Sequence, residues 1–173
     1  MGTKVSRRDA LHLALMSSEN RMASALARHY PGGRSAFTRA MNNTARQLGM
    51  RNSRFYDSTG LSTRNVSTAR DLAKLIAAAY RQPLIRQFTQ DTNKEMRFST
   101  PAYSLMFNNT NPLVKNPDWD VRLSKTGYTD EAGRCLLMRA KPDQQELAIV
   151  LLNSVGKRTP VGDANRIRKW LKS

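Results

Sequence analysis

The heptapeptide Val121-Arg122-Leu123-Ser124-Lys125-Thr126-Gly127 decides how this chain folds. Val121 and Leu123 alternate with polar residues, which is the pattern of a strand with one buried face. Two more strands follow, at residues 135–139 and 147–152, with turn residues between them. Short connections between successive strands favour antiparallel pairing, so we expect a three-stranded meander.

The residues upstream of this strand have helical periodicity. A capping box of Ser6 and Asp9 opens a run of apolar residues that continues to a break at residues 30–33. Residues 37–48 form a second amphipathic pattern, for which Gly49 is a natural C-terminal stop. The first half of the chain is therefore expected to be mainly helical.

Further elements complete the expected architecture. Another helix opens at the capping box of Thr68 and Asp71 and ends before Pro83. Residues 98–107 are extended and rich in aromatic side chains, and Asp163 caps a closing helix. A helical cluster followed by an antiparallel meander and a final helix predicts an α+β fold.

Length and composition favour one globular domain. The chain has 173 residues, of which 39% are hydrophobic and 24% are charged, an ordinary globular balance. We expect a single domain over residues 1–173, with a helical part at about residues 1–95 and a sheet part at about residues 96–173. No apolar run approaches the roughly 18–20 residues that span a bilayer, and no leader in this sequence directs export.

The charge is strongly positive and spread along the chain. Lys and Arg total 29 against 13 Asp and Glu, which gives a net charge of +16. Such an excess attracts polyanions, but no basic run interleaved with aromatic residues indicates specific nucleic-acid binding. Two histidines and one cysteine argue against a His-based metal site, a Ser-His-Asp triad and an internal disulfide.

Two short motifs carry the candidate chemistry: Ser18-Glu19-Asn20 in the helical half and Lys125-Thr126-Gly127 at the end of the first strand. Each has a structural alternative. Ser18 and Asn20 are also residues that terminate helices, and Lys125 is also compatible with a solvated strand end. For Trp119, bordering a groove and simple packing are equally good interpretations, whereas Cys135 is expected to be packed among apolar neighbours.

The order of these motifs matches the second and third of three elements shared by penicillin-binding proteins and serine β-lactamases. Several further phrases accompany them, namely 13–20 LALMSSEN, 30–33 YPGG, 57–61 DSTGL, 67–72 STARDL, 109–111 NTN, 125–129 KTGYT and 132–135 AGRC. With these phrases the whole chain resembles the D-alanyl-D-alanine carboxypeptidase and endopeptidase family of low-molecular-weight penicillin-binding proteins. The likeness is greatest to its endopeptidase branch.

The resemblance implies a partial penicillin-binding protein or serine β-lactamase-like fold and three catalytic residues. Ser18 is expected to relay a proton toward the leaving nitrogen. Asn20 is expected to hydrogen-bond the substrate amide and help to hold the base. Lys125 is expected to place positive charge beside the relay hydroxyl and the substrate carboxylate.

The same resemblance implies three substrate-binding residues. Thr126 and Gly127 are expected to bind the substrate as an added antiparallel strand, because a glycine leaves room for that approach. The backbone N–H of Tyr128 is expected to supply half of the oxyanion hole, where the loss of one donor commonly costs about 3–4 kcal/mol of barrier.

The family's first motif, Ser-x-x-Lys, has no acceptable match. Ser154 and Lys157 have the spacing, but they follow the last strand and Gly156 interrupts any helix there. The resemblance therefore implies that the nucleophile and base lie upstream of residue 1, and that this chain alone is inactive. It also implies that missing strands would leave an apolar edge at about residues 146–153, so we expect self-association.

The leading hypothesis is a serine-type D-alanyl-D-alanine endopeptidase or carboxypeptidase that acts on peptidoglycan through an acyl-enzyme. The alternatives are a β-lactamase-type hydrolase on the same fold and a non-catalytic fragment that binds peptidoglycan or regulates a partner. The resemblance implies peptidoglycan peptides and β-lactams as ligands of the complete protein, a periplasmic location, and no cofactor or metal. Specific nucleic-acid binding is not expected.

Overall fold

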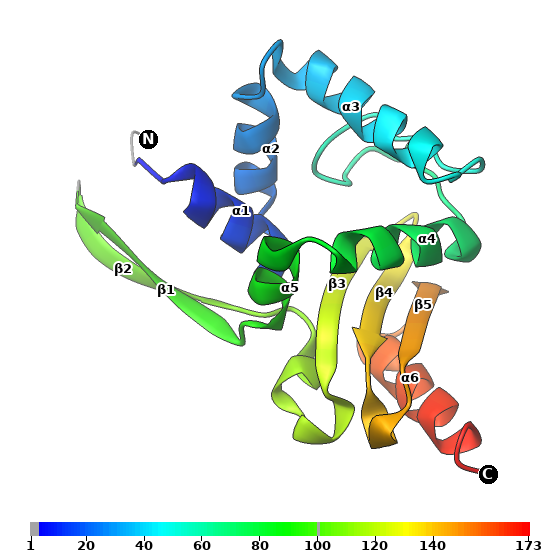
Figure 1. The fold of residues 1–173 in the computed structure, drawn as a ribbon. Coiled ribbons are helices and arrows are strands. Elements are labelled where there is room, and N and C mark those ends of the chain that lie inside the picture. Colours follow the sequence, from blue (N-terminus) through cyan, green and yellow to red (C-terminus); the bar gives the residue numbers. More distant parts are fainter. Residues whose placement is uncertain (1–3, 100) are drawn as a thin grey trace.

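The computed structural model describes residues 4–99 and 101–173, and its centre is a three-stranded antiparallel sheet (Figure 1). The strands β3 (Val121–Thr129), β4 (Gly133–Ala140) and β5 (Leu147–Ser154) pair in the order β3-β4-β5. This is the expected meander. The helices α4 and α5 cover one face of the sheet and α6 covers the other, which confirms the α+β class.

The apolar run expected before residues 30–33 is divided between two helices, α1 (Arg7–Met16) and α2 (Asn20–Arg28). Helix α1 ends because Ser18 adopts the left-handed backbone conformation, with φ of 56°, which cannot continue a right-handed helix. Helix α2 therefore leaves in a new direction (Figure 1). The expectation of one continuous helical run is wrong here, because the spacing of apolar residues does not indicate that one residue, Ser18, has a left-handed backbone conformation.

The next helices largely follow the sequence pattern. Helix α3 (Gly33–Gln47) is followed by Gly49 with φ of 69°, and α4 (Ala69–Tyr80) is capped by the Thr68 side chain. Pro83, however, does not end the helical part. It opens a short helix, α5 (Pro83–Gln90), because a proline is tolerated in the first helical turn, where its missing N–H has no partner to lose.

The expected extended segment at residues 98–107 is part of a hairpin that begins earlier. Strand β1 (Asn93–Ser99) pairs antiparallel with β2 (Ala102–Asn108) as a separate two-stranded sheet, and Thr100 lies outside the described residues. The helices give way to strands between Gln90 and Asn93. The hairpin projects away from the central sheet (Figure 1).

Three short 3-10 helices flank the strands of the sheet: η1 (Pro112–Lys115) and η2 (Pro117–Trp119) precede β3, and η3 (Pro142–Gln144) connects β4 to β5. The closing helix, α6 (Thr159–Trp170), begins before the position expected for it. Asp163 lies inside this helix, where it pairs with Arg166, and does not cap it. None of the helices within residues 4–99 and 101–173 is long and apolar enough to cross a bilayer.

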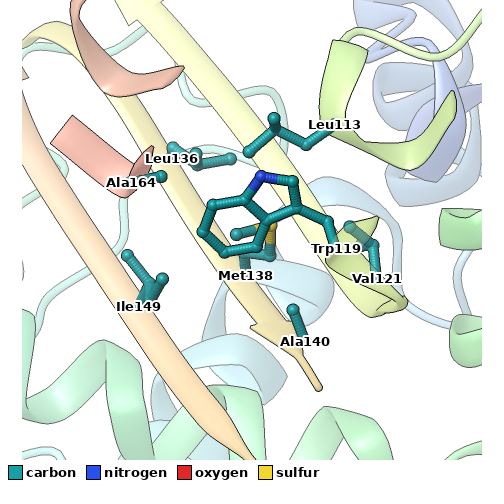
Figure 2. Close-up of a cluster of buried hydrophobic side chains, with 8 residues drawn as sticks. All are labelled: Leu113, Trp119, Val121, Leu136, Met138, Ala140, Ile149 and Ala164. Carbon is teal, nitrogen blue, oxygen red and sulfur yellow. The ribbon is translucent and has the colours of Figure 1, made fainter. Parts of the chain in front are cut away.

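The core between the sheet and α6 is built around Trp119 (Figure 2), which is completely buried. Its indole packs among residues from η1, the three strands and α6, namely Leu113, Val121, Leu136, Met138, Ala140, Ile149 and Ala164. Its Nε1–H donates to Oδ1 of Asn165 at 3.1 Å, which satisfies the one polar group of the indole. Of the two interpretations of Trp119, packing is therefore the one that the structure supports.

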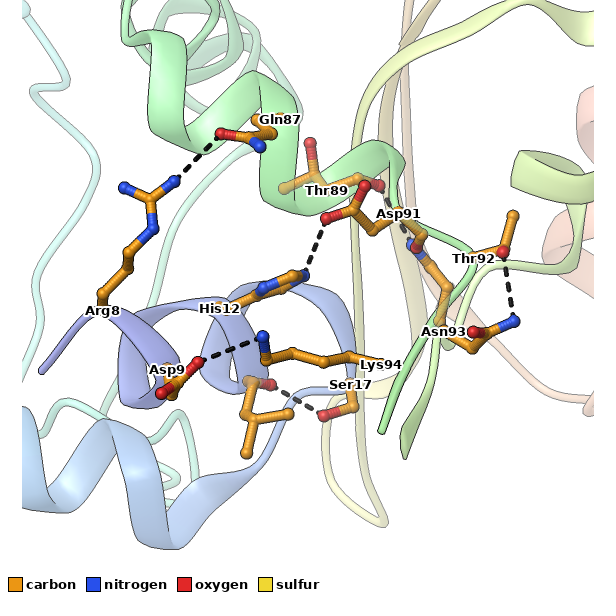
Figure 3. Close-up of polar contacts among 12 residues, drawn as sticks. Arg8, Asp9, His12, Ser17, Gln87, Thr89, Asp91, Thr92, Asn93 and Lys94 are labelled. Carbon is orange, nitrogen blue, oxygen red and sulfur yellow. Dashed lines mark hydrogen bonds and ion pairs between the residues drawn. The ribbon is translucent and has the colours of Figure 1, made fainter. Parts of the chain in front are cut away.

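A polar cluster fixes α1 against α5 and the hairpin (Figure 3). Nε2 of His12 lies 2.9 Å from Oδ2 of Asp91, and the imidazole stacks on Phe88 with 4.3 Å between ring centroids. Lys94 pairs with Asp9 at 3.1 Å. Burial lowers the pKa of His12, although the neighbouring Asp91 acts in the opposite direction. These contacts set the direction of α1, the helix that precedes Ser18.

The two tryptophans provide a matched test of this core. Trp119→Ala leaves a large cavity at the centre of the sheet–α6 interface and is expected to lower the free energy of unfolding by about 3–5 kcal/mol. Trp170→Ala, at a side chain that is 73% exposed, is expected to change it by less than about 0.5 kcal/mol. Urea unfolding followed by circular dichroism measures both, and equal effects would contradict the described packing.

Candidate active site

The site begins at the break between α1 and α2. The backbone N–H groups of Ser17 and Glu19 both donate to the carbonyl of Leu13, at 3.1 and 3.2 Å, which closes the end of α1 around Ser18. The left-handed conformation of Ser18 costs about 1–2 kcal/mol for a residue with a side chain. It turns the hydroxyl of Ser18 toward strand β3, where Oγ accepts a hydrogen bond from Nζ of Lys125.

Lys125 is the charged centre of the site. Its ammonium group donates to Oγ of Ser18 and to the carbonyl of Thr126, the latter at 2.7 Å. No carboxylate in the described residues lies within ion-pair distance of it. Burial lowers the pKa of Lys125 to about 8, because the charged form is desolvated. The site therefore holds a cation whose proton is more readily released than that of an ordinary lysine.

The expected site residues share one groove of about 910 Å³. Its lining includes all six of them: Ser18, Asn20, Lys125, Thr126, Gly127 and Tyr128. Asn20 is the first residue of α2 and is exposed. The structure thus brings together residues from the helical half and from β3 that the sequence separates by about a hundred positions. Their chemical roles remain proposals.

The outer edge of β3 is open toward this groove. Strand β3 pairs only with β4 within the described residues, so its other edge offers free backbone groups. Gly127 lies on that strand, and its lack of a side chain keeps the wall of the groove low. This geometry suits an extended peptide that adds as a further strand.

Sequence reasoning gave no site role to the loop at residues 109–111. Oγ1 of Thr110 bonds Oγ1 of Thr126 at 2.6 Å, and the backbone N–H of Thr110 donates to the carbonyl of Met16 at 3.3 Å. Asn109 anchors this loop, because its side-chain amide donates to the carbonyls of Thr89 and Asp91 at 3.0 and 2.9 Å. Thr110 thus links the end of α1 to β3. The only sequence signal was the phrase Asn109-Thr110-Asn111.

Cys135 also departs from expectation. It is half-buried and lines the groove on the β4 side, where a fully packed side chain was expected. The register places it opposite Gly127, and the small glycine leaves the thiol less covered than its apolar neighbours. Among the described residues, no group of three His, Cys, Asp or Glu side chains is arranged to hold a metal ion.

Fold and site together define the class: a helical cluster packed on an antiparallel sheet, with a Ser-x-Asn turn facing a Lys-Thr-Gly strand, as in penicillin-binding proteins. The Streptomyces K15 DD-transpeptidase superposes with a TM-score of 0.89 and 28% identity, covering 98% of this chain and 69% of its own. Penicillin-binding protein D2 from Listeria monocytogenes, in its cefotaxime-bound form, gives a TM-score of 0.81 at 25% identity, covering 95% and 66%.

The chain belongs to the D-alanyl-D-alanine carboxypeptidase family, whose profile matches residues 1–156. It is 49% identical, over all of its 173 residues, to D-alanyl-D-alanine endopeptidases of Pseudomonas aeruginosa and Escherichia coli, and spans 56% of each. The carboxypeptidase DacF of Bacillus subtilis is 30% identical over 98% of this chain and 43% of its own length. These matches confirm the resemblance to the endopeptidase branch, to which penicillin-binding protein 7 belongs. The chain spans about half the length of these curated relatives.

The lowered pKa of Lys125 predicts a pH-dependent contribution to stability. Between about 8 in the folded state and 10.5, the ordinary value, the unfolded chain binds more protons at this residue. The free energy of unfolding, relative to that of Lys125→Met, is therefore expected to rise as pH increases from about 8 to about 10.5. Urea unfolding over this range measures the difference, and Lys169→Met controls for the loss of one exposed positive charge. A pH-independent difference would contradict the desolvation of Lys125.

Proposed function

We propose that this chain supplies the proton-relay and substrate-binding parts of a serine-type D-alanyl-D-alanine peptidase that acts on peptidoglycan. The observation that carries the proposal is the contact between the Lys125 ammonium and the Ser18 hydroxyl at the side of an open strand edge. Family membership supports the reaction class. The 49% identity to two endopeptidases favours cleavage of D-Ala-containing cross-links over removal of terminal D-Ala.

The proposed reaction passes through an acyl-enzyme. A serine hydroxyl attacks the carbonyl carbon of the D-Ala residue, the C–N bond breaks, and the leaving amine takes up a proton. Ser18 is positioned to pass that proton, because its Oγ already accepts a hydrogen bond from a lysine with a lowered pKa. Water then hydrolyses the acyl-enzyme. The attacking serine is proposed to come from a Ser-x-x-Lys segment of the complete protein.

The remaining site residues are proposed to hold the substrate. Asn20 also lines the groove and would bond the amide of the peptide, while Thr126 and Gly127 present the open edge of β3. The backbone N–H of Tyr128 would stabilise the oxyanion as one of two donors. We propose β-lactams as ligands of the same groove, as the cefotaxime-bound relative suggests, and the periplasm as the location of the complete protein.

A non-catalytic function is the second candidate. Within this sequence the one serine with a lysine three positions later is Ser154, at the end of β5 on the far side of β4 from the Lys125 strand. It cannot supply the nucleophile beside Ser18. A chain in this form is expected to bind peptide without hydrolysing it, and retained binding of muropeptides without cleavage would support this candidate.

Adjacent serines allow a direct test of the proton relay. In the complete protein that carries a Ser-x-x-Lys segment, Ser18→Ala and Lys125→Ala are each expected to slow labelling by a fluorescent penicillin by about 10²–10⁴-fold, the usual contribution of positioned proton transfer. Ser17→Ala removes a neighbouring hydroxyl, which bonds only the carbonyl of Leu13 in the described residues, and is expected to label normally. Undiminished labelling of Ser18→Ala would contradict the role given to Ser18.

The free edge of β5 predicts self-association of this chain. Strand β5 has no second partner strand in the described residues, and its Leu152 is 39% exposed. An unpaired apolar edge can pair with another chain, so oligomers are expected at concentrations on the order of tens of micromolar. Leu152→Lys is expected to reduce them. Light scattering measures the mass, and a monomeric wild-type chain would contradict this prediction.

A further inference from the structure

The loop at residues 109–111 presents a threonine between two anchoring asparagines. The side-chain amide of Asn109 donates to two backbone carbonyls, and its Oδ1 accepts from the N–H of Asn111 at 2.9 Å. The side chain of Asn111 is buried, and its Oδ1 accepts from the N–H of Leu113 at 3.1 Å. Thr110 is exposed and lines the groove. The two asparagines thus use their side chains to fix the loop, which leaves the side chain of Thr110 available to the groove.

The hydroxyl of Thr110 is paired with the hydroxyl of Thr126 on β3. Thr126 donates to Oγ1 of Thr110 at 2.6 Å, and neither hydroxyl has another hydrogen-bond partner within residues 4–99 and 101–173. The backbone N–H of Thr110 donates separately to the carbonyl of Met16, at 3.3 Å. Because this second contact uses only the backbone, a change of side chain at position 110 is expected to leave it in place.

The bond to Thr110 selects one rotamer of Thr126. A threonine carries a hydroxyl and a methyl group on Cβ, and staggered rotation about χ1 exchanges their positions. Thr126 is half-buried on β3, a strand whose outer edge has no partner in the described part of the chain. With Oγ1 held by Thr110, which also lines the groove, the polar branch of Thr126 is fixed beside the path proposed for the peptide.

We propose that Thr110 is a positioning residue, which holds the hydroxyl of Thr126 toward a peptide bound along β3. This inference rests on the proposed function and adds a residue to it. A hydroxyl both donates and accepts, so Oγ1 of Thr126 can bond Thr110 and a polar group of the peptide at the same time. Two hydroxyls in series also polarise each other, which strengthens the outer bond. In this role Thr110 acts through Thr126.

Binding of a short peptide that ends in D-Ala-D-Ala to this chain measures the effect. Thr110→Val replaces the hydroxyl by a methyl group of similar size and is expected to weaken binding by about two- to tenfold, as for the loss of one neutral hydrogen bond. Thr110→Ser keeps a hydroxyl and is expected to bind as the wild-type chain does. Titration calorimetry measures the affinities, and circular dichroism checks that each variant is folded.

A double-mutant cycle with Thr126 separates positioning from a general effect on the fold. Thr126→Val removes the hydroxyl through which Thr110 is proposed to act. In that background Thr110→Val is expected to have no further effect on binding, whereas two independent effects would add. Thr63→Val is the matched control, because Thr63 is an exposed threonine outside the groove. It is expected to bind the peptide as the wild-type chain does.

Three results would overturn the proposal: full affinity of Thr110→Val, a Thr110→Ser variant as weak as Thr110→Val, or an equal loss from Thr110→Val with and without the hydroxyl of Thr126. A wild-type chain that binds no peptide also rejects it.

The outcome is separable from that of the proposed function. Penicillin labelling of the complete protein that depends on Ser18 retains the peptidase even where Thr110→Val binds peptide normally, and only the positioning role is then rejected. The converse pattern, in which peptide binding depends on Thr110 through Thr126 but labelling does not depend on Ser18, retains the positioning role and rejects the proton relay.

Discussion

The desolvated ammonium of Lys125, placed against the hydroxyl of Ser18, joins two parts of the chain that lie 107 positions apart. Without a carboxylate partner in the described residues, this charge depends on the Ser18 hydroxyl and the Thr126 carbonyl to accept its hydrogen bonds. The break between α1 and α2 must therefore stay at Ser18, in a backbone conformation that costs energy. The contact between Ser18 and Lys125 holds the helical half against the sheet half, and the groove is lined by residues of both halves.

Further contacts hold the helical half and the sheet half in their relative positions. The pair of His12 and Asp91 fixes α1 against α5 (Figure 3), and α5 packs on β3. Asn109 anchors the loop that carries Thr110, which in turn bonds both the end of α1 and Thr126. The position of Ser18 relative to the strand edge is thus determined twice, once through the helices and once through this loop. Such double support is what a proton relay needs.

The side chains that line the groove carry positive charge. The net charge of +16 is distributed over the whole chain and by itself indicates little about a ligand. Inside the groove, however, the lining contains Lys125, Arg134, Lys157 and Arg158, and no acidic side chain is among the described lining residues. The pKa of Lys125 is lowered by burial, because the charged form is desolvated.

The sequence alone determined the α+β class, the three-stranded meander and the two motifs. The alternation of apolar and polar residues along β3 and the residues of the motifs Ser18-Glu19-Asn20 and Lys125-Thr126-Gly127 are local properties of the chain. It did not reveal the left-handed turn at Ser18, the helix that Pro83 opens, or the contacts of Thr110 with β3 and the end of α1. Those features depend on contacts between residues distant in sequence, such as Thr110 with Thr126 and Lys125 with Ser18. Only the packed structure decided them, since burial and charge pairing exist only after the chain has folded.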